Sequence, residues 1–199
     1  LASACAGASV PLVHVSTDYV FDGAKSGAYR ETDPVHPLSV YARTKSEGEA
    51  AVRRILPRHI IIRTAWLFGT HGSNFLKTMV RLAAERDTID VVADQRGSPT
   101  APDDLAEAVL RVAAMLARGE RPWGTYHFAV TGETTRHGMA ERIIAAQRPF
   151  TGRAPRVNPV TSADYPTPAR RPKNSVLDSS KFAATFGYRA SDWRDAVDR

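Results

Sequence analysis

The chain has 199 residues, enough for one core or for one core with a small lobe attached, because domains usually run to about 100–200 residues. With 43% hydrophobic and 24% charged residues it has the composition of an ordinary globular protein, which excludes the disordered and fibrous classes. The net charge of +6 comes from 27 Lys and Arg spread among 21 acids, with no basic run interleaved with aromatics, so we expect no nucleic-acid partner.

The cysteine count and the apolar runs bear on location. Cys5 is the only cysteine, so no internal disulfide forms, and a reducing, cytoplasmic location is expected. No run approaches the ~20 apolar residues that a membrane helix needs, so no membrane partner is expected. The alanine-rich start resembles the tail of a helix and the end stops within a helical pattern without a cap, so we interpret the chain as a fragment.

Predicted strands and helices alternate along the chain. The strands are short apolar runs at 11–20, 59–67, 89–93 and 124–130, and the helical patterns lie at 40–56, 74–86, 102–117 and 179–186. Strands that alternate with helices of ten residues or more indicate right-handed βαβ units and a parallel sheet. The predicted fold class is therefore α/β, with a doubly wound parallel sheet. Residues 148–173, rich in Pro, Arg and Thr, are predicted to form a long functional loop near a small second lobe.

Polar side chains follow the first predicted strand. Residues 16–23 place hydroxyls and a carboxylate at the carboxyl edge of a parallel sheet, where open α/β sheets bind ligands. In the next predicted helix, Tyr41 and Lys45 are four positions apart and share one face. A nearby ammonium favours the phenolate and makes the tyrosine a usable acid, while the hydroxyl of Thr17 or Ser16 would hydrogen-bond to a carbonyl oxygen. Together these groups suggest a carbonyl-reduction site.

A Tyr-x-x-x-Lys pair on a helix also occurs as surface decoration. Two neighbouring features favour the catalytic interpretation here. A strand ending in Ser-Thr precedes the tyrosine, and a buried strand running into Arg63, Thr64 and Trp66 follows it.

Several motifs occur in one order along the chain. They lie at 16–23, 29–34, 37–49, 63–66, 74–75, 94–100 and 171–178. In this order they resemble the dTDP-4-dehydrorhamnose reductases, a family of extended short-chain dehydrogenases. The resemblance implies a Rossmann-type sheet whose N-terminal strands and glycine-rich cofactor turn lie upstream of residue 1. It also implies a cofactor domain made of residues 1–70 and 101–132, interleaved with a C-terminal substrate lobe made of residues 71–100 and 133–199.

The resemblance also implies roles for particular residues. Thr17, Tyr41 and Lys45 match the catalytic positions. The cofactor-binding set is Ser16, Tyr41, Lys45 and Thr64. The substrate-binding set is Thr17, Asp18, Tyr19, Trp66, Asn74 and Arg171. Core packing is the competing account for Trp66, and a surface salt bridge is the competing account for Arg171.

The implied reaction uses NADPH, or NADH, to reduce the 4-keto group of dTDP-4-dehydro-L-rhamnose to dTDP-L-rhamnose. Some members of the family hold Mg²⁺ between subunits with acidic side chains, which would make the protein a homodimer, and Asp103 lies near one matching position. Acids also suit a helix start on their own account, because they oppose the helix dipole.

Two alternatives remain open at the level of sequence. One is a non-catalytic regulatory subunit resembling that of methionine adenosyltransferase, which keeps much of the same site. The other is an epimerase or dehydratase of the same superfamily. A dehydratase normally has paired acids after its threonine, whereas Asp18 and Tyr19 stand here.

Overall fold

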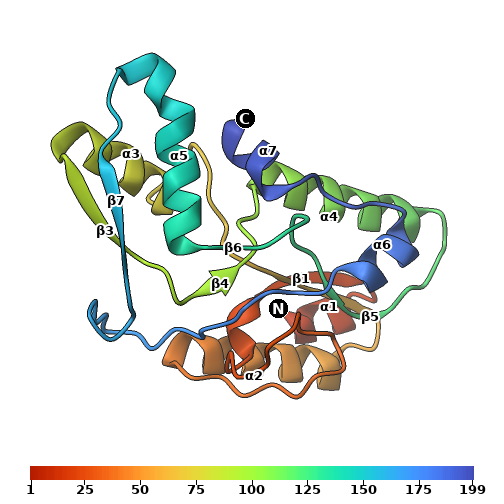
Figure 1. Cartoon of the computed structure of the whole chain (residues 1–199). Coiled ribbons are helices and arrows are strands. Elements are labelled where there is room, and N and C mark those ends of the chain that lie inside the picture. Colours follow the sequence, from red (N-terminus) through yellow and green to blue (C-terminus); the bar gives the residue numbers. More distant parts are fainter.

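The structure is a computed structural model that describes residues 1–199. Its larger sheet contains three parallel strands in the order β1-β2-β5. The strands are β1 (Leu12–Thr17), β2 (His59–Thr64) and β5 (Gly124–His127). The helices beside this sheet are α1 (Ala2–Gly7), α2 (Val40–Ile55), α4 (Pro102–Ala117) and α6 (Ser180–Phe186). Figure 1 shows α1 and α2 on one face and α4 and α6 on the other, so the predicted doubly wound α/β class is confirmed.

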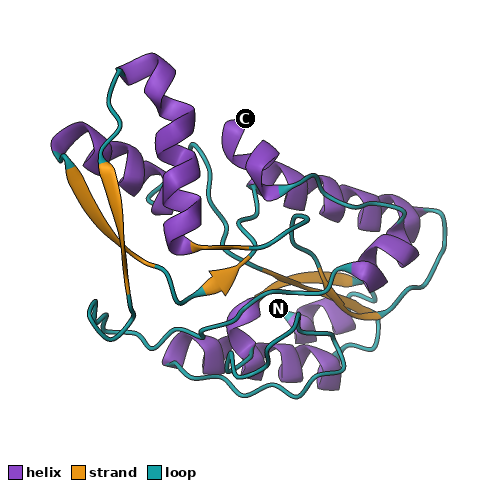
Figure 2. Cartoon of the chain, in the orientation of Figure 1, coloured by secondary structure: helices purple, strands orange, loops and turns teal.

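A second, smaller sheet lies at the left of Figure 1. It pairs β3 (Thr88–Val92) with β7 (Arg156–Val160) in parallel, and Ile89 stands opposite Val157. Two helices pack together beside it, α3 (Phe75–Glu85) and α5 (Arg136–Thr151). A short antiparallel pair, β4 (Arg96–Gly97) and β6 (Thr134–Thr135), lies between the two sheets, and α7 (Trp193–Asp198) packs against α5. Figure 2 shows how much of the remainder is loop.

Several predicted elements need correction. The segment 148–173 is not a loop throughout, because it contains the end of α5 and all of β7. The predicted strand at 89–93 does form, but it pairs with β7 and lies outside the larger sheet. The helix at 179–186, assigned from the sequence to the smaller lobe, packs as α6 against β5 and α4 of the larger sheet.

Local chemistry accounts for two of the differences between prediction and structure. The Pro-rich composition of residues 148–173 favoured a loop because proline is depleted from strands, yet β7 contains Pro159, since a strand of a two-stranded sheet tolerates a missing N–H donor. The predicted strand at 11–20 ends early, at Thr17, because the Thr17 side chain accepts a hydrogen bond from the Tyr19 amide and caps a 3₁₀ turn over Asp18–Val20.

One continuous hydrophobic core joins the two sheets. It contains Ile60 and Ile62 of β2, Phe182 of α6, and Met139 and Ile143 of α5. All six residues of β2 are buried, as expected for the central strand of a sheet covered on both faces. No helix of the chain is long and apolar enough to cross a membrane.

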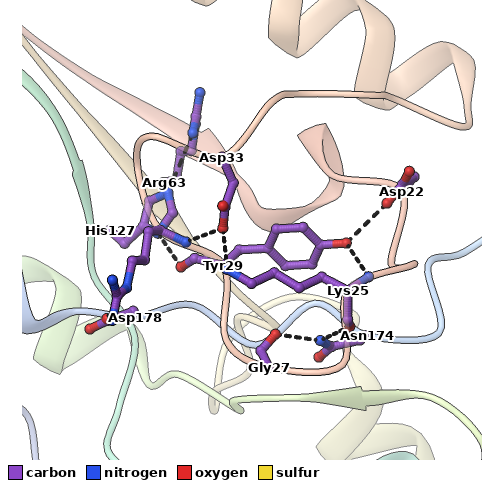
Figure 3. Close-up of polar contacts among 10 residues, drawn as sticks. Asp22, Lys25, Gly27, Tyr29, Asp33, Arg63, His127, Asn174 and Asp178 are labelled. Atoms are coloured by element: carbon purple, nitrogen blue, oxygen red, sulfur yellow. Dashed lines mark hydrogen bonds and ion pairs between the residues drawn. The ribbon is translucent and has the colours of Figure 1, made fainter.

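The loop that follows β1 is braced by the C-terminal segment, as Figure 3 shows. The Tyr29 ring stacks on Phe21 with 4.2 Å between centroids, and its hydroxyl donates to Asp22 Oδ1 at 3.0 Å. Asn174 Nδ2 donates to the carbonyl oxygens of Lys25 and Gly27 at 2.7 and 2.9 Å. The bonds from Asn174, together with the hydrogen bond from the Tyr29 amide to the Val176 carbonyl oxygen, hold residues 22–29 and 174–178 together.

Candidate active site

Thr17 is the last residue of β1 and lies opposite Thr64, the last residue of β2. Its side chain is buried, and its Oγ1 donates to Asp18 Oδ1 at 2.9 Å. The Oγ1 of Thr64 is buried and has no hydrogen-bond partner in the protein. Two hydroxyls therefore stand side by side at the carboxyl edge of the parallel sheet, the edge at which such sheets bind ligands.

Helix α2 brings Tyr41 and Lys45 to this edge. The helix begins after Ser39, whose Oγ accepts a hydrogen bond from the Ala42 amide at 3.2 Å. Lys45 Nζ donates to the Val15 carbonyl oxygen at 2.8 Å, which ties the lysine to β1. The Tyr41 ring meets Tyr19 edge to face at 6.3 Å between centroids, and 55% of Tyr41 remains exposed. The tyrosine thus packs against Tyr19 while more than half of the residue stays exposed.

A cavity of about 260 Å³ lies between these elements. Thr17, Tyr41 and Lys45 all line it, as do Ser16 and Thr64. The five residues predicted to be catalytic or cofactor-binding therefore come together around one space. A threonine hydroxyl, a phenol and an ammonium around a shared space can orient a carbonyl group and deliver a proton to its oxygen.

Behind the cavity, Glu49 fastens α2 to β2. It lies one helical turn beyond Lys45 and is almost completely buried. Arg63 Nε and Nη2 donate to the two Glu49 carboxylate oxygens at 2.9 and 2.7 Å. Burial alone would raise the pKa of Glu49, but the hydrogen bonds and charge of Arg63 hold it below its ordinary value. The bidentate pair fixes how α2 sits on the sheet, and so where Tyr41 and Lys45 point.

Asp18 is the buried carboxyl group of the site, with 2% of the residue exposed. Burial raises its pKa to about 6, against the opposing hydrogen bond from Thr17 and the charge of Arg136. The carboxyl group therefore changes protonation close to neutral pH. The Asp18 carboxyl group accepts the only proton of the Thr17 hydroxyl. Its charge therefore affects how the Thr17 hydroxyl can interact with a substrate carbonyl.

A second, larger cavity of about 600 Å³ adjoins the first. Four residues line both cavities and so form the boundary between them: Tyr19, Trp66, Leu67 and Arg136. Beyond the boundary the walls are largely apolar, with Phe75 and Met79 of α3, and Arg171 also lines this space. A small reacting group in the first cavity and a larger attached group in the second would fit this shape.

Trp66 is held in an unusual conformation at the boundary. Its backbone φ is +44°, a region that non-glycine residues seldom adopt. Its Nε1 donates to Ser175 Oγ at 3.0 Å. A Cβ built on Gly97 would lie 2.3 Å from Trp66 Cε2, so only glycine allows the indole to lie there. Strain and close backbone approach of this kind occur at ligand-binding positions.

Two of the predicted residues lie elsewhere. Asn74 caps α3, where its Oδ1 accepts from the Lys77 amide at 3.2 Å and its Nδ2 donates to the Gly69 carbonyl oxygen at 2.7 Å. It lines neither cavity, and a substrate role for it stays a prediction. Asp103 is exposed in the first turn of α4, and no group of three or more His, Cys, Asp or Glu side chains is placed to hold a metal ion. Nothing in the structure supports Mg²⁺.

Arg136 is the boundary residue that sequence reasoning missed. It is the first residue of α5, and its guanidinium lies 3.6 Å from the Trp66 ring centroid and 5.2 Å from that of Phe75. No local motif marks it, because it is some 70 residues beyond Trp66 along the chain and reaches the site only through the tertiary fold.

The fold and the site together define a carbonyl reductase of the extended short-chain dehydrogenase type. More narrowly, residues 1–199 match the RmlD substrate binding domain throughout, and the chain belongs to that family.

Named relatives agree with this assignment. The chain is 46% identical over 202 residues to the dTDP-4-dehydrorhamnose reductase of Aggregatibacter actinomycetemcomitans, covering 99% of this chain and 68% of that protein. Among solved structures, the Clostridium acetobutylicum dTDP-4-dehydrorhamnose reductase has a TM-score of 0.91 and 39% identity, covering 100% of this chain and 67% of that one. The Bacillus anthracis enzyme, solved in complex with NADP, has a TM-score of 0.87 and 33% identity with the same coverage.

Proposed function

We propose that the chain carries the catalytic residues and the sugar-nucleotide site of a dTDP-4-dehydrorhamnose reductase. The reaction is the NADPH-dependent reduction of the 4-keto group of dTDP-4-dehydro-L-rhamnose to dTDP-L-rhamnose. One observation carries the proposal: Thr17, Tyr41 and Lys45 line a single small cavity that opens beside a larger one. The names of relatives that are 46% and 39% identical support the same reaction.

Each catalytic side chain has a distinct task. The Thr17 hydroxyl positions the substrate carbonyl, and Tyr41 gives its phenolic proton to the oxygen that becomes the new hydroxyl. The Lys45 ammonium stabilises the phenolate that remains on Tyr41. Thr17 now donates its only proton to Asp18, so it must turn away from Asp18 Oδ1 to donate to a ketone.

The residues around the small cavity also suit a nicotinamide cofactor. The Thr64 Oγ1 is buried without a partner, and Lys45 Nζ lies at the same cavity, so both can hold ribose or amide groups. When bound, NADPH supplies the hydride that reduces the carbonyl carbon. The complex of the Bacillus anthracis relative with NADP supports the choice of NADPH over NADH.

The division of the chain into two sides, and its oligomeric state, are also proposed. Residues 1–70 and 101–132 form the cofactor-binding side, while residues 71–100 and 133–199 form the substrate side. Helix α6 is an exception, since it belongs by packing to the larger sheet. A homodimer working in the cytoplasm fits the family.

The alternatives explain less. A regulatory subunit would not require Tyr41 accessible beside Thr17 and Lys45, and the relatives at 46% and 39% identity carry the name of an enzyme. A dehydratase needs paired acids after its threonine, and Tyr19 occupies the second position.

The test is NADPH oxidation by the full-length protein, followed at 340 nm, with dTDP-4-dehydro-L-rhamnose as substrate. We expect turnover with this sugar and formation of dTDP-L-rhamnose by chromatography. If purified protein that binds both ligands produces no rhamnose product, the proposal of a reductase is wrong and the regulatory alternative gains support.

A further inference from the structure

The single proton of the Thr17 hydroxyl is already used inside the protein. Thr17 Oγ1 donates to Asp18 Oδ1 at 2.9 Å, and it accepts a hydrogen bond from the Tyr19 amide at 3.2 Å. A hydroxyl group has one proton to donate, and a ketone oxygen can only accept. The hydrogen bond between Thr17 and Asp18 must therefore change before Thr17 can donate to a substrate carbonyl.

The burial of Asp18 decides how that hydrogen bond changes. Only 2% of Asp18 is exposed, and its second carboxylate oxygen, Oδ2, has no hydrogen-bond partner in the protein. If Thr17 turned away from an ionised Asp18, a buried carboxylate would lose the hydrogen bond from Thr17, which is strongly unfavourable. A protonated Asp18 instead donates its own O–H to Thr17 Oγ1, and the Thr17 proton is then free for the ketone.

Arg136 is the cation that acts most strongly on Asp18. Burial raises the pKa of Asp18, and the charge of Arg136 opposes that rise. Burial lowers the pKa of Arg136, and the charge of Asp18 opposes that fall. Stacking fixes the guanidinium in place, with 3.6 Å to the Trp66 ring centroid and 5.2 Å to that of Phe75. Arg136 and Asp18 therefore each stabilise the charged form of the other.

Other polar groups surround Asp18 or line the same cavity. They come from β1, the 3₁₀ turn, the C-terminal segment and α2, and they are Thr17, Tyr19, Ser175, Tyr41 and Lys45. Burial raises the pKa of Tyr19, and the charge of Asp18 raises it further, so the phenol of Tyr19 is neutral. Arg171 acts on Tyr19 and on Arg136. With Tyr19 neutral, Arg136 remains the main charge that acts on Asp18.

We propose that Asp18 is a positioning residue that, when protonated, donates a hydrogen bond to Thr17 and so turns the Thr17 hydroxyl toward the substrate carbonyl. This inference rests on the proposed function. No proton leaves Asp18 during the reaction, because Tyr41 still gives its proton to the carbonyl oxygen. Arg136 favours the carboxylate form of Asp18, so it sets the pH range in which Thr17 can act.

The test is the pH dependence of kcat/KM for dTDP-4-dehydro-L-rhamnose in the full-length protein, because this ratio reports ionisations of the free enzyme. The pKa of Asp18 is raised to about 6, so wild-type kcat/KM should fall as the pH rises above that value. We expect a fall of about 10- to 50-fold between pH 6 and pH 8. In Asp18→Asn the amide Nδ2 donates to Thr17 at every pH, so the fall should shrink to about twofold or less.

Substitutions of Arg136 test what sets the position of this fall. Arg136→Met removes the charge that favours the Asp18 carboxylate, so the fall should begin roughly 0.5–1 pH unit higher. Arg136→Lys keeps the charge and should restore the wild-type position, which a role in packing alone would not do. Arg148→Met is the matched control, because Arg148 is exposed in the last turn of the same helix and lines neither cavity. It should leave the pH profile unchanged.

The outcomes separate this inference from the proposed function. Wild-type protein without turnover at any pH would overturn the proposed function, and the inference with it. Normal wild-type turnover, with Asp18→Asn either inactive at every pH or showing the wild-type fall, would overturn only the role of Asp18. A profile that does not move in Arg136→Met, or that moves equally in Arg136→Lys, would overturn the role of Arg136. Should one of the two positions not tolerate substitution, the variant at the other still decides, since Asp18→Asn must remove the fall and Arg136→Met must shift it.

Discussion

Replacing Glu49 by Gln tests how α2 is held in place. The substitution keeps the size of the side chain but leaves Arg63, 3% exposed at its side chain, without a countercharge inside the protein. Removing one partner of a buried ion pair costs about 3–5 kcal/mol. For a chain of this size we expect a fall in melting temperature of roughly 6–20 °C, at roughly 2–4 °C for each kcal/mol.

The pH dependence gives this prediction a second signature. The folded-state pKa of Glu49 lies below its ordinary value, so the stabilisation from its charge is present above the unfolded pKa, near 4.3 for Glu. It is lost as the pH falls through the lower folded value. The difference in melting temperature between wild type and Glu49→Gln should therefore be full at pH 7 and shrink below about pH 4.

Thermal unfolding followed by circular dichroism measures both effects. The control is Glu85→Gln, which breaks the exposed pair with Arg81 and should cost about 0.5 kcal/mol or less. A Glu49→Gln variant as stable as Glu85→Gln at pH 7 would show that the buried pair does not hold α2 on the sheet.

Three further substitutions probe the site. Asp18→Asn should raise the melting temperature at pH 7.5 relative to wild type, because the folded pKa of Asp18 is raised to about 6 and burial of its ionised form destabilises the folded state. The gain should vanish near pH 4, and a constant difference across this range would contradict the argument. Gly97→Ala should destabilise the protein by about 1–3 kcal/mol and shift the tryptophan fluorescence, since the Trp66 indole must move. An unaltered spectrum and melting curve would refute the close contact between Gly97 and Trp66. Asn74→Ala should cost about 1 kcal/mol in urea unfolding through loss of the α3 cap, and a normal affinity for dTDP would leave the cap as its only role.

Elements with clear local signals were predicted within a residue or two. The bounds of α2 and α4 follow from Ser39 as a cap, Pro57 as a terminator and Pro102 at a helix start. Elements that depend on contacts with distant parts of the chain were not predicted. β7 exists because β3 pairs with it, and α5, with Pro149 near its end, was not predicted as a helix at all.

The site shows the same division between local and long-range information. Tyr41 and Lys45 could be placed together because a helical turn relates them, and Thr17 because it ends a strand at the binding edge of the sheet. The boundary arginine could not, since α5 brings Arg136 to Trp66 only after the two sheets have packed on one core. Asn74 was drawn into the predicted site by its motif, although its hydrogen bonds are accounted for by the start of α3.

In the proposed reaction, the Tyr41 phenol delivers the proton to the reduced carbonyl. The decisive measurement of this role is the turnover number of Tyr41→Phe in the full-length protein. The control is Tyr188→Phe, because Tyr188 is half-buried and lines neither of the two cavities. We predict a fall in kcat of about 10²- to 10⁴-fold for Tyr41→Phe, with dTDP affinity preserved, and near-normal turnover for Tyr188→Phe. A Tyr41→Phe enzyme that turns over at the wild-type rate would contradict the assignment.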